Sequence, residues 1–236
     1  MNKYKILSQV SNLLEDKNQN QEIKYSDTKY SIKDDLINKL NINYLQTISK
    51  PPANDSKSTI RDLKELQEIT QNRSTEDIKL IYMVDREPMD LFNRYLIAFR
   101  LSVPQKLFND IYWNYFDIIT TDLKYFYNRA RPIQLAEMHD VQINVITTET
   151  HHTPAYPSGH SVYAYTLAYL CSELFPDHKK QLFQIADRCG EARILQGVHY
   201  RSDIQAAKTL VSKLYPKIKN LRNITTLHKI TQGEKE

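Results

Sequence analysis

The fold prediction depends mainly on the segment PSGHSVYAYTLAYLC, residues 157–171. Ser158 suits the N-cap of a helix, because a serine side chain can accept a hydrogen bond from the free backbone N–H groups of the first turn. The apolar run that follows is predicted to continue this helix to about Leu174. The run is about half of the roughly 20 apolar residues that a membrane span needs. We therefore expect a buried core helix, and not an integral membrane protein.

The rest of the chain is also predicted to be helical. Of its 236 residues, 41% are apolar, and 4 glycines against 16 tyrosines argue against many tight hairpins. Apolar residues recur at helical spacing in six further segments. The first runs from a predicted N-cap at Ser58 to Ile69, and the second begins after the capping pattern Ser74-Thr-Glu-Asp. The others run over Met89 to Phe99, Gln105 to Tyr127, Lys179 to Gln196 and Asp203 to Leu214. The predicted fold class is all-α, a helical bundle.

The chain divides into three parts by composition. Residues 1–50 are polar and rich in Asn and Lys, and we expect an extension packed on the body. The prolines of KPPANDS, residues 50–56, exclude helix and lead into a helical domain at 51–215. Residues 216–236 carry an excess of Lys and Arg and are expected to form a loose basic tail. Within the domain, residues 133–156 are expected to form a long loop.

The remaining composition bears on the environment of the protein. Two cysteines, Cys171 and Cys189, are too few for a disulfide framework, so we expect buried free thiols in a reducing compartment. The first ten residues lack the apolar core of a signal peptide, which favours a cytoplasmic location. The net charge is only +4 and sits largely in the tail, so no nucleic-acid partner is expected. The sequence does not indicate the oligomeric state.

Three clusters contain residue types that bind anions or transfer protons. The first is KYFYNRARP, residues 124–132. Lys124 and Arg131 are seven residues apart, so they are predicted to project from one face of a helix that Pro132 then breaks. Cations near a helix C-terminus are also favoured by the helix dipole alone. By itself this cluster is therefore weak evidence for a site.

The second cluster is the start of the helix at Ser158. A helix N-terminus offers unpaired N–H groups and a positive dipole to an anion. Gly159 lets a ligand approach the backbone closely, and His160 lies in the first turn, aimed at the same point. The alternative interpretation is an ordinary capped helix with a surface histidine.

The third cluster is RILQGVHYRSD, residues 193–203. Arg193 is predicted to end a helix, and Gly197 to allow a sharp turn. His199 and Asp203 are four residues apart, a spacing that lets a carboxylate hold an imidazole N–H and leaves the other ring nitrogen free as base or nucleophile. A single His–Asp pair is more often structural than catalytic. Together, however, the three clusters supply cations, backbone donors and two imidazoles for a multiply charged oxyanion.

The order of these motifs resembles a known family. Lys-x6-Arg-Pro, Pro-Ser-Gly-His and Arg-x5-His-x3-Asp, between Lys124 and Asp203, resemble the type 2 phosphatidic acid phosphatase superfamily. That superfamily includes soluble class A bacterial acid phosphatases, membrane lipid phosphatases and vanadium-dependent haloperoxidases. The helical context extends the likeness over about residues 51–214. One departure is Ala192, where the third motif usually has serine; this removes a possible hydrogen bond but keeps the charge of Arg193.

The resemblance implies a soluble phosphatase that hydrolyses small phosphomonoesters through a phosphohistidine, without a metal or other cofactor. His199 would attack phosphorus, and Asp203 would orient it. His160 would protonate the leaving oxygen and then activate water. The residues expected to bind the phosphate oxygens are Lys124, Arg131, Ser158, Gly159 and Arg193.

Two alternatives stay open. The same pocket could bind vanadate with His199 as its ligand, and a vanadium-dependent haloperoxidase would then oxidise halide with hydrogen peroxide. The motifs do not separate this activity from phosphatase action. The second alternative is a non-catalytic oxyanion-binding protein. The loop at 133–156 would set the substrate, with His151 and His152 as possible entrance residues. Tyr156 and Trp113 could form walls of the pocket, although core packing is the favoured role for Trp113.

Overall fold

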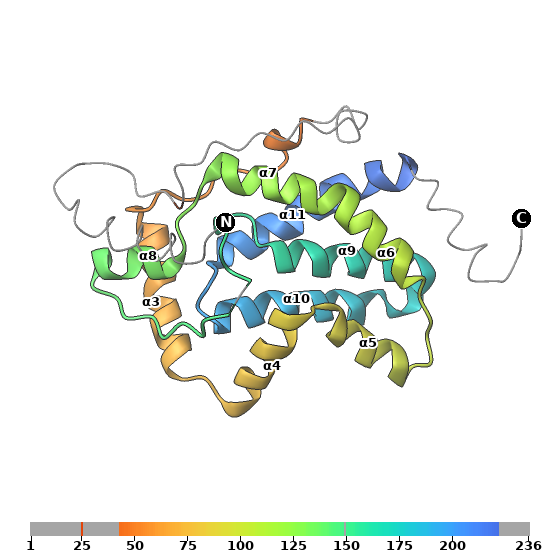
Figure 1. Ribbon diagram of the computed structural model, residues 1–236, viewed down its shortest axis with the longest axis horizontal. Helices are drawn as coiled ribbons and strands as arrows, with labels where there is room; N and C mark the ends of the chain where they lie inside the picture. The colour runs from red at the N-terminus through yellow and green to blue at the C-terminus, as the bar shows by residue number, and fades with distance from the viewer. Residues whose placement is uncertain (1–24, 26–42, 149, 222–236) are drawn as a thin grey trace, which may run out of the picture.

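The computed structural model describes Tyr25 and residues 43–148 and 150–221 (Figure 1). No β-strand occurs in these residues, which confirms the all-α prediction. In chain order the elements are η1 (Tyr44–Gln46), α3 (Lys57–Gln71), α4 (Thr75–Arg86), α5 (Met89–Ala98), α6 (Gln105–Ile111), the π-helical segment η2 (Tyr112–Asp117), α7 (Ile118–Tyr127), α8 (Pro132–Ala136), η3 (Glu137–His139), α9 (Gly159–Leu174), η4 (Pro176–His178), α10 (Lys179–Leu195) and α11 (Arg201–Leu221).

The core is built around α9, the helix predicted from residues 157–171. Helix α9 packs against α10 and α11 and also touches η2, α5 and α7 (Figure 1). Apolar side chains are buried on most sides of this helix, from Val162 to Leu170. Cys171 and Cys189 are buried and unpaired with each other, as predicted. A helix that is apolar all round must be covered by neighbours, which accounts for its central position.

The first helices show how side-chain caps set the boundaries. The start of α3 was predicted at Ser58, and this is wrong by two residues: the side chain of Ser56 accepts from Thr59 N at 3.2 Å and is the N-cap. The capping pattern at Ser74 is confirmed. Its hydroxyl accepts from Asp77 N at 3.1 Å, and Asp77 accepts from Ser74 N at 2.8 Å.

The predicted helix from Gln105 to Tyr127 is present, but its middle turn is a π-helix. In that turn the hydroxyl of Tyr112 donates to Asp117, five residues later, at 3.4 Å. A π-turn inserts an extra residue per turn and so rotates the following residues to a new face. The helix ends at Tyr127, where Asn128 adopts a left-handed conformation with φ 47°.

The prediction that Lys124 and Arg131 share one helical face is therefore wrong. Arg131 is extended (φ −72°, ψ 155°) and lies beyond the end of α7. Pro132 does not simply end a helix; it is the first residue of α8, where its missing N–H costs nothing. The predicted loop at 133–156 is consequently shorter, since α8 and η3 take up its first residues.

The last helix is longer than predicted. Helix α11 begins at Arg201 and continues through Pro216 to Leu221, past the expected start of the basic tail. Tyr215 and Ile218 are buried. Burial of each such side chain is worth on the order of 1.5–3 kcal/mol, which offsets the cost of about 3 kcal/mol for an interior proline.

Residues 43–50, the described end of the predicted N-terminal extension, pack on the body. Tyr127 donates its hydroxyl to the carbonyls of Leu45 and Ile48, each at 3.2 Å. Tyr156 donates to Ser49 O at 2.6 Å. Apart from Tyr25, the extension before residue 43 lies outside the described residues, as does the tail after residue 221. Within the described part of the chain, no helix combines the length and apolarity needed to cross a membrane.

Candidate active site

The three predicted clusters meet at one cavity of about 390 Å³. Lys124, Arg131, Gly159, His160 and His199 line it. The other three predicted residues do not line the cavity and are almost fully buried; these are Ser158, Arg193 and Asp203. The clusters are joined because α7 and the turn before α8 face the N-terminal ends of α9 and α11.

His199 is fixed on both sides of its ring. Its Nδ1 lies 2.9 Å from Asp203 Oδ2, and its Nε2 lies 2.9 Å from a guanidinium nitrogen of Arg131. An arginine can only donate, so Nε2 must accept, and the ring proton is placed on Nδ1, where it donates to Asp203. Burial, followed by the charges of Arg131 and Lys124, holds the pKa of His199 well below its usual value. The imidazole is thus neutral, with the lone pair of Nε2 at the cavity wall.

Asp203 is held as well, by a residue that the sequence did not assign to the site. Arg129 forms an ion pair with Asp203 Oδ1 at 2.5 Å, and both side chains are buried. Its guanidinium carbon lies 3.9 Å from the centre of the Tyr200 ring. Tyr200 N donates to Asp203 Oδ2 at 3.0 Å. Burial raises the pKa of Asp203, and the charge of Arg129 opposes that rise.

The position of Arg131 is fixed by carbonyl groups. Its Nε donates to Thr153 O at 2.9 Å, and one terminal nitrogen donates to Val198 O at 2.7 Å as well as to His199. Its backbone N–H donates to the side chain of Gln134 at 2.7 Å. Burial, with the nearby charge of Arg193, lowers the pKa of Arg131 to about 10. It remains a cation at neutral pH.

Lys124 brings a second cation to the same wall. Its Nζ donates to Pro154 O at 2.6 Å, and the side chain is 6% exposed. Burial, together with the charge of Arg131, lowers the pKa of Lys124 well below its usual value. A Cβ added at Gly159 would lie 3.7 Å from Lys124 Cε, so the lysine side chain passes close to the start of α9.

Ser158 is the N-cap of α9, as predicted. Its Oγ accepts from Ser161 N at 3.4 Å and from Ser161 Oγ at 3.0 Å. Its backbone N–H donates to Asp203 O at 3.2 Å. This bond connects the start of α9 to the start of α11, and so couples the position of His160 to that of His199.

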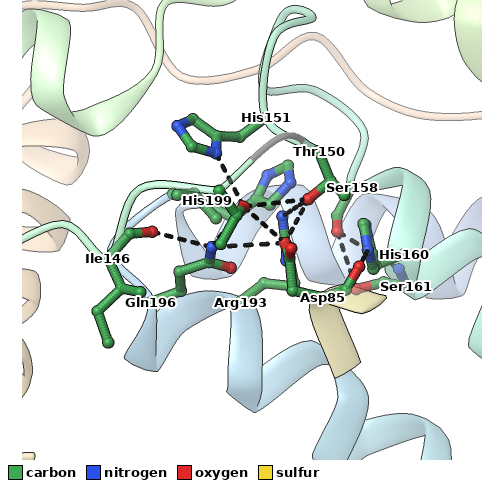
Figure 2. Close-up of polar contacts among 12 residues, drawn as sticks. Asp85, Ile146, Thr150, His151, Ser158, His160, Ser161, Arg193, Gln196 and His199 are labelled. Atoms are coloured by element: carbon green, nitrogen blue, oxygen red, sulfur yellow. Dashed lines mark hydrogen bonds and ion pairs between the residues drawn. The ribbon is translucent and has the colours of Figure 1, made fainter. Parts of the chain in front are cut away.

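Arg193 is bound by Asp85, a residue that the sequence analysis missed (Figure 2). The two side chains form an ion pair at 2.5 Å, and Arg193 also donates to Thr150 Oγ1 at 3.1 Å. Asp85 further accepts from the hydroxyls of Thr148 and Thr150. Burial raises the pKa of Asp85, but the hydrogen bonds from Thr150 and Arg193 outweigh it and hold that pKa at about 2.

His160 lies beside this ion pair (Figure 2). Its Nε2 is 3.3 Å from the carbonyl oxygen of Asp85, which can only accept, so this nitrogen carries a proton. Burial, followed by the charge of Arg193, lowers the pKa of His160 to about 3. Without a bound anion, the second imidazole is therefore also neutral near pH 7.

The lining of the cavity differs from what was predicted for Trp113 and for the histidine pair His151 and His152. Trp113 is not in the core: it is 59% exposed and lines the cavity, next to Tyr112. From the loop before α9, Thr150 and Thr153 line the cavity, but His151 and His152 do not. The two histidine rings stack on each other instead, with centroids 5.1 Å apart.

The fold and the cavity define an all-α protein whose site presents fixed cations, a helix N-terminus and an oriented imidazole to an oxyanion. The PAP2 superfamily matches residues 115–210, the segment that contains all three clusters. This match supports the resemblance that the motifs predicted.

Three curated relatives are similar to part of the chain. The chain is 38% identical over 58 residues to an acid phosphatase of Zymomonas mobilis subsp. mobilis. This alignment covers 25% of the present chain and 22% of the relative. It is 30% identical over 89 residues to a non-specific acid phosphatase of Salmonella typhimurium, or 38% of this chain and 35% of the relative. It is 31% identical over 58 residues to a non-specific acid phosphatase of Providencia stuartii, or 25% and 23%. The alignments thus span at most 35% of these relatives.

Proposed function

We propose that this protein hydrolyses phosphomonoesters, with His199 as the nucleophile and a phosphohistidine as intermediate. The observation that carries the proposal is the double fixation of His199. Asp203 accepts a hydrogen bond from Nδ1–H and Arg131 donates one to Nε2, both at 2.9 Å. The imidazole is neutral, so Nε2 needs no prior deprotonation to act as a nucleophile. Its lone pair accepts from Arg131 in the free site, and this hydrogen bond has to move from Nε2 to a phosphate oxygen before Nε2 attacks. The acid phosphatase names of the partial relatives support the same reaction class.

The wall around His199 suits the charge of a phosphate group. Lys124 and Arg131 bring two cations, and the N-terminus of α9 adds backbone N–H groups at Gly159 and His160. These donors are held by carbonyl groups and helix ends before any ligand arrives. Preorganised donors of this kind stabilise the charge of a five-coordinate transition state, and loss of one typically costs about 100-fold in rate.

The reaction balances in two steps. First, His199 Nε2 forms a bond to phosphorus while the bond from phosphorus to the leaving oxygen breaks, and His160 gives that oxygen a proton. Second, a water oxygen attacks phosphorus, the bond to Nε2 breaks, and His160 takes the proton of the water. Asp203 stays ionised and stabilises the charge that develops on the His199 ring.

His160 must be protonated for the first step, yet its pKa is only about 3 in the free site. A phosphate dianion bound next to it favours the charged imidazole and raises that pKa. The reaction is therefore expected to be faster at mildly acid than at alkaline pH.

Arg193 has a more distant part in this proposal than the resemblance implied. It does not line the cavity, and its ion pair with Asp85 neutralises much of its charge. We assign it the role of fixing the wall beside His160, with direct contact to phosphate left to Lys124 and Arg131.

The same residues also fit vanadate, the cofactor of the alternative activity. Lys124, Arg131 and the start of α9 would hold its oxygens, and His199 Nε2 would be its protein ligand. When bound, vanadate supplies the activation of peroxide for halide oxidation. No feature of the cavity favours this use over ester hydrolysis, so it enters as an arm of the test.

The test measures phosphate release from phenyl phosphate, and bromide oxidation by peroxide after incubation with vanadate. We expect phosphate release by the wild type, and a loss of about 1,000-fold or more in kcat for His199→Ala. The control is His139→Asn, which changes a histidine that does not line the cavity. Bromide oxidation without phosphate release, or full activity in His199→Ala, would contradict the proposal.

A further inference from the structure

The cavity has a second end, whose chemistry differs from that of the phosphate-binding end. Three aromatic residues line it in a row: Trp113 meets Tyr112 edge-on with centroids 5.0 Å apart, and Tyr112 packs on Tyr163 at 4.5 Å. Two carboxylates, Glu87 and Asp117, also line this end. We call these five residues the outer wall. A volume of about 390 Å³ is within the usual range for a pocket that holds an organic ligand.

One helix connects the two ends of the cavity. Trp113, Asp117, Thr121 and Lys124 all line it, at intervals of four, four and three residues along η2 and α7. Because all four line the same cavity, they lie on the same side of η2 and α7. Asp117 and Lys124 are separated by about 10 Å of helix axis at 1.5 Å per residue. A molecule with phosphate at Lys124 therefore reaches the outer wall if its leaving group extends several ångströms from phosphorus.

The outer wall carries two carboxylates, and at longer range Arg86 interacts with Glu87 and Lys124 with Asp117. Among the described residues, no salt bridge joins Glu87 or Asp117 to a cation. The neighbouring cation, Arg86, also lines the cavity but is paired with Asp90. An anionic group in the leaving part of the substrate would be repelled here, whereas a cation would be attracted by both carboxylates.

The aromatic row adds a second preference for the same kind of ligand. The indole of Trp113 is 59% exposed, a large fraction for the most hydrophobic side chain of the wall. The face of an indole attracts organic cations, and aromatic residues combined with carboxylates recognise alkylammonium groups. A neutral apolar leaving group gains binding free energy only from contact with the aromatic row. A cationic leaving group is attracted by the carboxylates as well, so charge distinguishes the two.

We propose that the outer wall is a leaving-group site for an organic ammonium ion, a proposal that rests on the proposed phosphatase activity. The preferred substrates are then phosphomonoesters with a cationic leaving group. In such a substrate the phosphate lies at Lys124 and Arg131, and the ammonium lies between Trp113, Glu87 and Asp117. Monoesters with a second phosphate or a carboxylate in the leaving group are poor substrates.

Three aryl phosphates that differ only at the para position test this assignment. One carries a trimethylammoniomethyl group, the second the neutral neopentyl group of the same shape, and the third a carboxymethyl group. The cationic ester is expected to exceed the neutral one in kcat/KM by about tenfold, a size typical of a cation held by aromatic and carboxylate groups. The carboxymethyl ester is expected to be the slowest.

Two variants locate the effect. Trp113→Leu keeps an apolar side chain but removes the aromatic face, and Asp117→Asn removes one negative charge; each is expected to reduce the preference for the cationic over the neutral ester by about threefold or more. Tyr82→Leu is the matched control, because Tyr82 is 57% exposed and does not line the cavity. It is expected to keep both the activity and the preference.

The outcomes separate this proposal from the one on which it rests. If none of the esters, nor phenyl phosphate, is hydrolysed, the proposed function fails. If all are hydrolysed and the neutral ester equals or exceeds the cationic one, the ammonium site is overturned and the phosphatase activity stands. A preference that survives unchanged in both variants would also overturn the assignment to the outer wall.

Discussion

Replacement of Asp85 by asparagine should destabilise the fold strongly, although the side chain keeps its size. In the folded protein the pKa of Asp85 is about 2, against 3.8 for an ordinary aspartate. This difference corresponds to about 2 kcal/mol in favour of the ionised folded form. Because the folded-state pKa is depressed, this stabilisation is complete above about pH 4 and is lost as the pH falls towards about 2.

The substitution also leaves Arg193 as a buried cation without a counter-charge. Its side chain is 1% exposed. Removal of one partner of a buried ion pair costs about 3–5 kcal/mol when the other charge stays buried. Since asparagine keeps some hydrogen bonds to Thr148 and Thr150, we expect a loss of about 2–4 kcal/mol in the free energy of unfolding at pH 7.

Urea denaturation at pH 7 and at pH 3 measures both effects. The matched control is Asp90→Asn, because Asp90 pairs with Arg86, whose side chain is 78% exposed. Such an exposed pair is worth about 1 kcal/mol or less. The wild type should also lose more stability than Asp85→Asn between pH 7 and pH 3. Equal stability of the two variants at pH 7 would refute the reasoning.

Three further predictions concern the site and the core. Because the pKa of Lys124 is lowered, kcat/KM should fall at a less alkaline pH than the loss of charge on an ordinary lysine would cause. Lys124→Arg should move this fall to higher pH. An unchanged pH profile would contradict the role of Lys124 as a phosphate-binding cation. Arg129→Met should raise the pKa of Asp203, because the charge of Arg129 lowers it. We therefore expect kcat to fall at least about tenfold at acid pH, with little change in KM. A loss of kcat that is the same at all pH values would indicate a merely structural role for Arg129. Gly190→Ala should lower the thermal midpoint, because an added Cβ would lie 2.6 Å from Ile204 Cγ2, and overpacking by about 1–3 kcal/mol exceeds the gain of about 1 kcal/mol in helix propensity.

Local signals in the sequence predicted the parts of the fold that depend on local chemistry. Ser158 and Ser74 were identified as caps because the bond from a serine hydroxyl to the first turn involves residues three positions apart. Gly197 was predicted at a sharp turn, and its φ of 83° is a conformation that suits glycine. For α3 the same signal predicted Ser58, whereas the cap is Ser56, and two serines two residues apart give the same local signal.

The juxtaposition of Lys124 and Arg131 was predicted for the wrong reason. Their spacing of seven matched two helical turns, but the left-handed Asn128 ends α7 between them. Arg131 reaches the cavity because the carbonyls of Thr153 and Val198 hold its guanidinium. Those partners come from distant parts of the chain, and no periodicity in the sequence reports them.

Two residues of the site were missed for a related reason. Asp85 is one of several acidic residues on α4, and its partner Arg193 lies 108 positions later. Arg129 lies within the first cluster, but only the fold shows that it binds Asp203. Trp113 was assigned to the core on hydrophobicity alone. It lies in the π-helical turn, and such a turn leaves no clear mark in the sequence.

The central claim is a covalent phosphohistidine at His199, and rapid quench of the reaction tests it most directly. The wild type is mixed with phenyl phosphate, quenched in alkali within the first turnovers to preserve an acid-labile phosphoramidate, and mapped by peptide mass spectrometry. We predict one added phosphoryl group on the peptide that contains His199, and none on the same peptide of His199→Ala. Turnover with no phosphoryl group at His199, or with one on His160 instead, would contradict the mechanism.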